Sequence, residues 1–180
     1  MGDITIENNQ YLTFQLGTEY FALEITRVRE VLDYINITKV PRTPDFMLGV
    51  INLRGNVVPV VDLHLSLGMP PQERTVDTCI VIVEIQIGAE TIQIGALADS
   101  VQEVVNLSDT DISPPPKLGI KLNTEFIQGM GKRNEQFLII LNIDKVLTSR
   151  EIEEVEIATS IVPPHEVVDV SAALESQNTL

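Results

Sequence analysis

The residues that could do acid–base, nucleophilic or metal chemistry are few in this chain. It has two histidines, His64 and His165, and one cysteine, Cys79. No HxH, HExxH or CxxC pattern supplies a ligand set for zinc. His64 follows Asp62 at the end of a strand-like run, where a surface or capping role is expected. Cys79 lies within an apolar run, where a cysteine behaves as a small buried hydrophobic residue. We therefore predict no metal site and no catalytic residue.

The acidic pair of the chain and its lack of nucleotide-binding motifs also argue against catalysis. Asp109 and Asp111 stand in a stretch rich in serine and proline, where carboxylates usually belong to solvated turns. The sequence has no GxxxxGKS/T or GxGxxG loop to bind phosphate, and no GxSxG nucleophile elbow. We predict no cofactor and no enzymatic activity, and we expect the chain to act through a binding surface.

The net charge of the chain excludes some classes of binding partner. The 180 residues carry a formal net charge of −14, which argues against nucleic acid and against an anionic membrane surface. From Glu151 onward there are seven acidic residues and no Lys or Arg. No apolar run approaches the roughly 20 residues that span a bilayer, and the N-terminus lacks the pattern of a signal peptide. With one cysteine and no internal disulfide, a cytoplasmic protein is expected.

The most informative stretch is residues 46–63, FMLGVINLRGNVVPVVDL. Two β-branched runs joined by Arg54-Gly55-Asn56 predict a β-hairpin, with Gly55 supplying positive φ at the turn. Arg54 then stands at the tip, where it has no core to support. Pro59 lacks an N–H, so its strand should lie at an edge or contain a bulge. Thr43 or Asp45 is expected to cap a short helix over residues 46–49.

Other strands follow from alternating or β-branched runs, and one helix follows from its cap. Thr148 and Glu151 have the spacing of a capping box, which predicts a helix that ends before Pro163-Pro164. Beyond it we expect disorder, so deleting the residues after Ser160 should leave the melting temperature nearly unchanged. Residues 26–33 and 99–107 fit a helical turn as well as a strand. The remaining expected strands are 11–16, 20–25, 78–87, 91–97, 127–131 and 136–143.

The two halves of the chain resemble each other. Residues 21–32 align without gaps on residues 94–105, and FMLG at 46–49 matches FIQG at 126–129. A repeat this long indicates two similar small β-domains in tandem. Each half offers about five short strands, enough to close a small barrel whose interior holds side chains and no ligand.

Three motifs together resemble the CheW family of bacterial chemotaxis coupling proteins. They are VREVL at residues 28–32, TPDFMLGVINLRGNVVPVVDL at 43–63 and LNTEFIQGMG at 122–131. The resemblance implies a mainly β fold of two tandem SH3-like five-stranded β-barrels with a C-terminal α-helix. The CheW-like domain would cover residues 10–160, between a flexible N-terminus (1–9) and a disordered acidic tail (161–180). Within it we expect barrel 1 at about 17–83, barrel 2 at about 84–147 plus the first strand, and the helix at about 149–160.

The same resemblance implies a non-catalytic adaptor. In the family, one surface binds the regulatory domain of the histidine kinase CheA, and another binds the cytoplasmic tip of chemoreceptors in arrays that control kinase activity. Residues Val101 to Val105 would line a groove between the barrels that accepts a receptor helix. Two alternatives stay open: the same role in another chemosensory pathway such as surface motility, and a small β-barrel enzyme. The partner-binding residues carried over are Val28, Glu30, Gly49, Asn52, Arg54, Gly55, Val101, Val104 and Val105.

Overall fold

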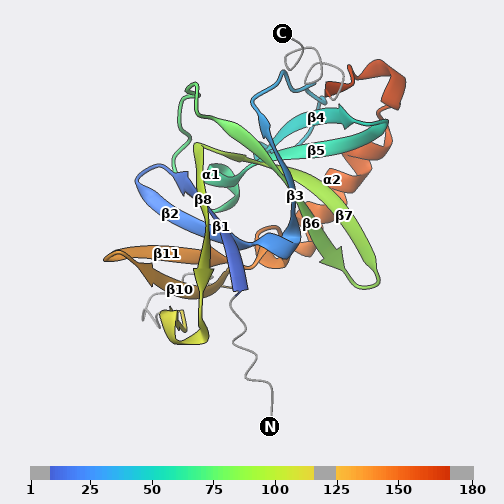
Figure 1. Ribbon diagram of the computed structural model, residues 1–180. Coiled ribbons are helices and arrows are strands. Elements are labelled where there is room, and N and C mark those ends of the chain that lie inside the picture. Colours follow the sequence, from blue (N-terminus) through green and yellow to red (C-terminus); the bar gives the residue numbers. More distant parts are fainter. Residues whose placement is uncertain (1–8, 116–124, 171–180) are drawn as a thin grey trace.

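The computed structural model describes residues 9–115 and 125–170 of the chain. This part is built mainly from strands (Figure 1), and none of its helices is long and apolar enough to cross a membrane. The strands are β1 (Asn9–Leu16), β2 (Glu19–Glu24), β3 (Val28–Asp33), β4 (Met47–Leu53), β5 (Asn56–Asp62), β6 (Cys79–Ile87), β7 (Glu90–Ala98), β8 (Ser100–Leu107), β9 (Ile112–Ser113), β10 (Ile127–Arg133) and β11 (Gln136–Leu141). The helices are α1 (Leu63–Ser66), α2 (Ser149–Ser160) and the 3-10 turns η1 (Ile25–Arg27), η2 (Asp109–Asp111), η3 (Ile143–Lys145) and η4 (Pro164–Glu166).

The strands form two sheets with the same plan. One sheet, here called barrel 1, has the order β3-β6-β7-β5-β4, and the other, barrel 2, has the order β8-β1-β2-β11-β10-β9. In each, a single parallel pair lies among antiparallel ones: β5 with β7, and β11 with β2. The plan matches the sequence repeat. β2 has the place in barrel 2 that β7 has in barrel 1, and β3 has the place in barrel 1 that β8 has in barrel 2. The expected mainly β, two-barrel fold is therefore present.

The two repeats exchange their first hairpins. The β1–β2 hairpin, at the start of the first repeat, pairs with β8 and β11 in barrel 2. The β6–β7 hairpin, at the start of the second repeat, pairs with β3 and β5 in barrel 1. As the resemblance implied, the first strand lies in barrel 2. The expected division at residues 17–83 and 84–147 differs from the structure, however, because β2 belongs to barrel 2 and β7 to barrel 1. Strand partners are long-range contacts, which the order of strands along the chain does not reveal.

Each barrel closes where the chain beyond one edge strand meets the other edge. In barrel 1, Thr38 follows β3 and exchanges two backbone hydrogen bonds with Val50 of β4, at 2.9 and 2.8 Å. In barrel 2, β9 follows β8 and pairs with β10. Closure leaves few unpaired strand edges, which otherwise invite aggregation. We call the junction in barrel 1 the seam.

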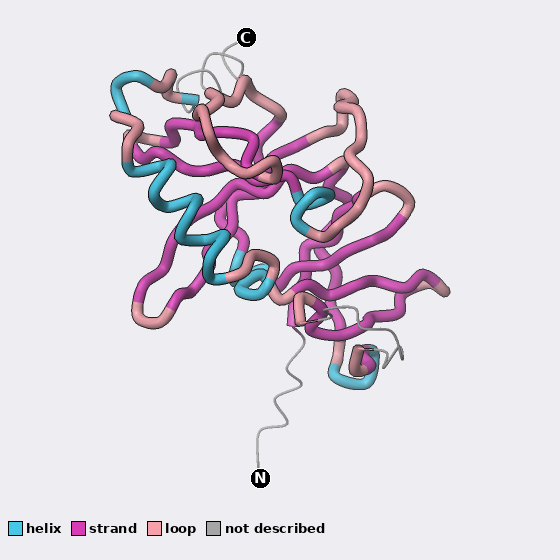
Figure 2. Tube along the Cα trace, turned by 180° about the vertical axis from the view of Figure 1, so that it is seen from behind, coloured by secondary structure: helices cyan, strands magenta, loops and turns pink. Residues whose placement is uncertain are grey.

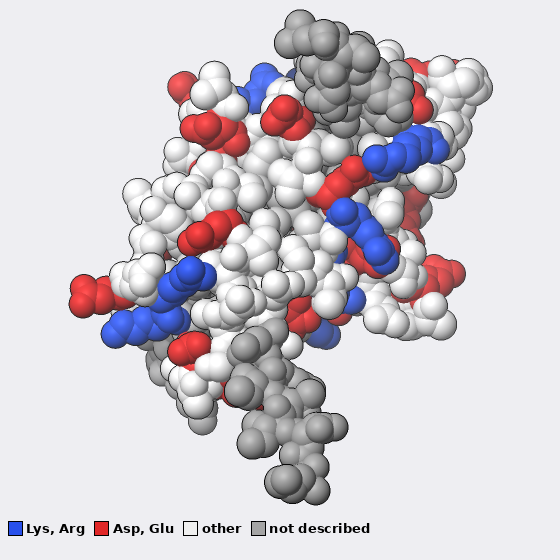
Figure 3. Space-filling view, viewed as in Figure 1, with Lys and Arg blue, Asp and Glu red and all other residues white. Residues whose placement is uncertain are grey.

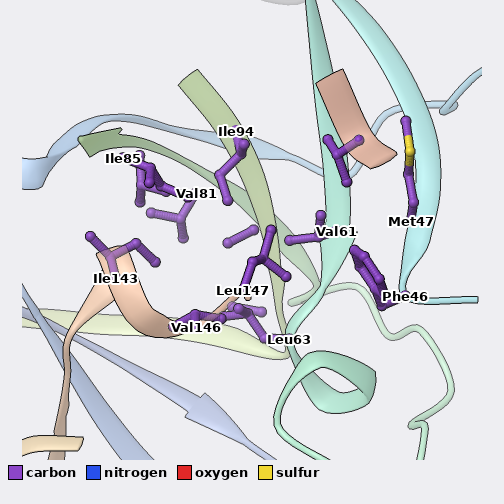
Figure 4. Packing of buried hydrophobic residues seen from close by; sticks show 14 of the residues in the cluster. Phe46, Met47, Val61, Leu63, Val81, Ile85, Ile94, Ile143, Val146 and Leu147 are labelled. Atoms are coloured by element: carbon purple, nitrogen blue, oxygen red, sulfur yellow. The ribbon is translucent and has the colours of Figure 1, made fainter. Parts of the chain in front are cut away.

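Buried apolar side chains form three clusters. One fills barrel 1, around Ile80 and Ile82 of β6, and one fills barrel 2, around Tyr11 and Leu138. The third and largest, which we call the interface core, lies between the barrels. Figure 4 shows part of it, with Val81 and Ile85 of β6 close to residues of the segment that follows β11. Because β6 buries both faces, its sequence is almost continuously apolar.

Helix α2 begins and ends as the sequence predicts. The Thr148 hydroxyl accepts from the Glu151 N–H at 3.1 Å, and the Glu151 carboxylate accepts from the Thr148 N–H at 2.9 Å. Ile152, Val155 and Ala158 are buried, so the helix packs by one face. Figure 2 shows it crossing the outside of the strands.

The structure settles one open choice and corrects two local expectations. The ambiguous segments 26–33 and 99–107 are mainly strands, β3 and β8, with η1 before the first. The short helix over residues 46–49 does not form, because β4 begins at Met47 and pairs with β5. Residues 161–170 are not disordered: they include η4, and Val167 and Val170 are buried. In both latter cases, tertiary contacts override the local signal.

Pro59 lies in β5, between β4 and β7 in the sheet. It stands opposite Val50, whose backbone N–H and C=O bond to Thr38 and so point away from β5. The parallel pairing with β7 begins only at Val60. No ladder hydrogen bond is therefore required of the proline nitrogen, and a central strand tolerates the residue.

Candidate partner-binding surface

The tip of the β4–β5 hairpin is a two-residue turn. Arg54 has φ of 52° and Gly55 has φ of 86°, the left-handed pair typical of a type I′ turn. The predicted positive φ of Gly55 is confirmed, whereas Asn56 is already the first residue of β5. The Gly55 N–H donates to Oδ1 of Asn52 at 2.9 Å. This bond holds the turn from within the strand that precedes it, so Arg54 projects from a rigid base.

Arg54 forms a two-point ion pair with Glu30. Nη1 and Nη2 of Arg54 donate to Oε1 and Oε2 of Glu30 at 2.7 and 3.0 Å. Sequence analysis selected both residues but did not pair them with each other. Glu30 lies on β3 and Arg54 at the end of β4, so the pair spans the seam of barrel 1. The hydrogen bond from Arg54 lowers the pKa of Glu30, although partial burial opposes this. The pair therefore presents a fixed, ionised surface group, with 62% of the Arg54 side chain exposed.

Asn52 is buried and serves the framework. Besides accepting from Gly55, its amide Nδ2 donates to the carbonyl oxygens of Pro164 and Val167, at 2.8 and 3.2 Å. The side chain thus joins the hairpin turn to the segment after α2. Its place in the sequence, within the NLRG motif, gave no sign of this long-range role.

Gly49 is also a framework position. It has φ of 146°, and a Cβ added there would lie 2.1 Å from the carbonyl oxygen of Thr38. The seam therefore requires glycine at this point, where two backbones approach each other. Gly49 is buried, so any effect on binding would pass through the shape of β4.

The valines of β3 and β8 occupy equivalent places in the two barrels. Val28 and Val101 are half-buried and pack against the interface core. Val104 is 47% exposed, and its repeat mate Val31 is 42% exposed. Val105 instead points into barrel 2 and is 2% exposed. It was expected to line the groove, but it is enclosed in the barrel. Figure 3 shows an uncharged area on the face of the molecule that carries β3 and β8, with charged side chains around it.

One pair of polar residues was not anticipated. His64 was expected to have a surface or capping role, but the residue is only 2% exposed. Its Nε2 lies 2.9 and 3.0 Å from the two carboxylate oxygens of Asp99. Asp62 does cap α1, since its Oδ1 accepts from the His64 N–H at 2.9 Å. Nothing in the local sequence links His64 to a residue 35 positions away.

Two further features bear on where a ligand could bind. A hollow of about 380 Å³ lies between β5, β7 and α2, lined by Val57, Pro59, Ile92 and Val155 among others, and it contains none of the expected partner-binding residues. Within residues 9–115 and 125–170, no cluster of three or more His, Cys, Asp or Glu side chains could hold a metal ion. Both barrel interiors are filled with apolar side chains.

Comparisons with known proteins agree with this architecture. A family model described as "CheW-like domain" matches residues 10–151. The "Chemotaxis protein CheW" of Klebsiella aerogenes is 34% identical over 147 residues, which cover 82% of this chain and 86% of that protein. The protein of the same name from Helicobacter pylori is 34% identical over 139 residues, covering 77% of this chain and 81% of the other.

A solved structure gives the same result for the fold. The scaffolding protein TtCheW from Thermoanaerobacter tengcongensis matches with a TM-score of 0.71 and 33% sequence identity. The match covers 80% of this chain and 95% of that one. Its two-barrel architecture is thus similar to the one described above.

Proposed function

Because this chain belongs to the CheW-like family of chemotaxis proteins, we propose that it is a non-enzymatic adaptor coupling chemoreceptors to a CheA-type histidine kinase. It would work in the cytoplasm, where it is recruited to membrane-associated receptor arrays. Its partners would be the regulatory domain of the kinase and the cytoplasmic tip of the receptors. Kinase control by such an assembly needs surfaces that hold two partners in a fixed relation.

The observation that carries this proposal is the Glu30–Arg54 pair. An arginine held in a two-point contact at the end of a rigid hairpin is a preorganised recognition group. The Arg54 side chain remains more than half exposed, so a partner can contact it without first ordering it. Val31 on β3 and Val104 on β8 offer exposed apolar surface. An apolar face beside a fixed charge suits an amphipathic helix.

The interiors of the barrels favour the adaptor over the enzyme alternative. An enzyme usually buries its substrate in a pocket with converging polar groups. Here Ile80, Ile82 and their neighbours fill barrel 1, and Tyr11, Leu107 and Ile140 help to fill barrel 2. Function is therefore sought on the outer surface.

The test is reconstitution with receptor cytoplasmic fragments and the kinase, with kinase autophosphorylation as the readout. We expect Arg54→Glu to lose assembly and kinase stimulation. Arg150→Glu is the matched control, because it makes the same charge change at a side chain that is 86% exposed on α2. If Arg54→Glu assembles and stimulates like the parent chain, the assignment of the hairpin tip is wrong.

A charge swap separates recognition from support of the seam. The double variant Glu30→Arg/Arg54→Glu can rebuild an ion pair inside the chain with reversed polarity. If a partner reads the charge of the tip, the double variant stays inactive although it folds. Recovery of kinase stimulation would instead assign the pair a purely structural role.

A further inference from the structure

The chain crosses between the barrels at two equivalent places. The first crossing runs from β2 in barrel 2 through η1 to β3 in barrel 1. The second runs from β7 in barrel 1 through Asp99 to β8 in barrel 2. The sequence repeat aligns these crossings, since residues 21–32 match residues 94–105. Like the segment after β11, which packs on barrel 1, they are points at which a change in barrel orientation must be accommodated.

Each crossing carries one member of a polar side-chain pair. At the second crossing, the Asp99 carboxylate accepts from Nε2 of His64, which follows β5, the last strand of the first repeat. At the first crossing, Arg27 forms an ion pair with Asp144, which follows the last strand of barrel 2. The two pairs therefore join equivalent positions, with the carboxylate at the crossing in one pair and after the last strand of the repeat in the other.

The helix caps support this equivalence. Asp62 caps α1 by accepting from the N–H of His64, two residues on. Asn142 caps η3 in the same way by accepting from the N–H of Asp144. In both repeats, a short capped turn after the last strand (β5 or β11) thus presents the residue that reaches the crossing.

Each carboxylate also binds a backbone N–H from a hairpin of the opposite barrel. Oδ2 of Asp99 accepts from Gly17 in the β1–β2 turn at 2.6 Å, and the Asp99 N–H donates to the carbonyl of Gln15 at 3.0 Å. Oδ1 of Asp144 accepts from the N–H of Gln86 near the end of β6 at 2.9 Å. One carboxylate is therefore held by both barrels at each crossing.

We propose that the two carboxylate junctions, His64–Asp99–Gly17 and Arg27–Asp144–Gln86, lock the orientation of the barrels and thereby set the spacing between β3 and β8. Asp99 immediately precedes β8, and Arg27 immediately precedes β3, so each junction fixes the start of one of these strands. His64, Asp99, Arg27 and Asp144 are positioning residues in this scheme. The consequence for partner binding rests on the proposed adaptor function, whereas the orientation of the barrels does not.

The His64 junction offers the sharper test because its geometry distinguishes two substitutions of similar size. Nδ1 of His64 is buried without a hydrogen-bond partner among the described residues, so the ring is held through Nε2 alone. A glutamine amide nitrogen reaches the position of Nε2, whereas an asparagine amide nitrogen reaches only that of Nδ1. His64→Gln should therefore keep the junction and remove the unpaired atom, and His64→Asn should leave Asp99 without its donor.

Orientation is measured directly with spin labels on Val31→Cys and Val104→Cys, one on each barrel at exposed repeat mates. Cys79 is buried and can be retained. We expect His64→Gln to reproduce the distance distribution of the parent chain. His64→Asn, and separately Asp99→Asn, should shift or broaden it while circular dichroism shows both barrels folded. Arg27→Gln, which opens the other junction, should likewise shift or broaden the distance distribution.

The outcomes separate this inference from the proposed function. In the unlabelled chain, opening the junction should reduce kinase stimulation at least about fivefold, a typical coupling between distant sites. If no variant, the parent chain included, stimulates a kinase, the proposed function fails but the distance measurement still stands. If His64→Asn does not fold, Asp99→Asn decides. An unchanged distance distribution in the folded Asp99→Asn chain overturns the proposal.

Discussion

Replacing Val170 by alanine should destabilise the barrels, although this residue lies ten positions beyond the end of α2. Its side chain is 3% exposed and packs in barrel 1 with Ile51 and Val58. Removing two buried methyl groups costs about 2 kcal/mol of unfolding free energy, counting transfer and cavity terms. Val168→Ala is the matched control, because that side chain is 81% exposed and its loss should cost less than about 0.5 kcal/mol.

Urea unfolding monitored by circular dichroism measures both variants against the parent chain. For a domain of this size, a loss of 2 kcal/mol corresponds to a melting temperature lower by about 4–8 °C. Deleting the residues after Ser160 should cost more, because Val167 and the two hydrogen bonds from Asn52 are lost as well. Equal unfolding midpoints for Val168→Ala and Val170→Ala would refute the packing of this segment.

Three further predictions concern single residues. Gly49→Ala should cost more than about 3 kcal/mol of unfolding free energy, since its Cβ would overlap a carbonyl oxygen. The Cβ of Gly55→Ala meets no atom within 4 Å, so this variant should cost about 1 kcal/mol, from its positive φ alone. Thermal melts compare the two variants, and equal losses of stability would contradict the close backbone approach at the seam. The hydrogen bond from Arg54 lowers the pKa of Glu30, so the pair stabilises the fold at pH values above the ordinary glutamate pKa, by at most about 1 kcal/mol. This stabilisation is lost as the pH falls through the lowered pKa. The unfolding free energy of Glu30→Gln, measured as a function of pH, should lack that decline. Parallel pH curves for the variant and the parent chain would refute a stabilising pair. Burial raises the pKa of the Cys79 thiol to about 11, so iodoacetamide at pH 8 should label it only in urea, and rapid labelling of the folded chain would contradict its burial.

Local chemistry was sufficient for several elements. The Thr148–Glu151 capping box predicted α2, because a cap and its helix lie within a few residues of each other. The run around Arg54-Gly55 predicted a hairpin, because a two-residue turn needs positive φ where glycine stands. The motifs were also specific enough to indicate the family, and the comparisons confirm it. The helix expected over residues 46–49 was wrong because the signal for it was only local.

The candidate surface was visible in the sequence as residues but not as an arrangement. Glu30 and Arg54 were both selected, yet their contact depends on closure of barrel 1 across the seam. Asn52 and Gly49 were selected with them, although burial gives both a framework role. Such roles depend on which segments face each other in the fold, and the spacing of residues along the chain does not reveal this.

By itself, the sequence determined the strand content, the repeat, the C-terminal helix and the family. These follow from periodicity, turn chemistry and motifs, which act over a few residues. Only the tertiary structure decided that the repeats exchange hairpins, that residues 161–170 pack on the barrels, and that His64 meets Asp99. The physical reason is that these contacts join residues far apart in the chain, where burial and backbone pairing decide the partner and local preference does not.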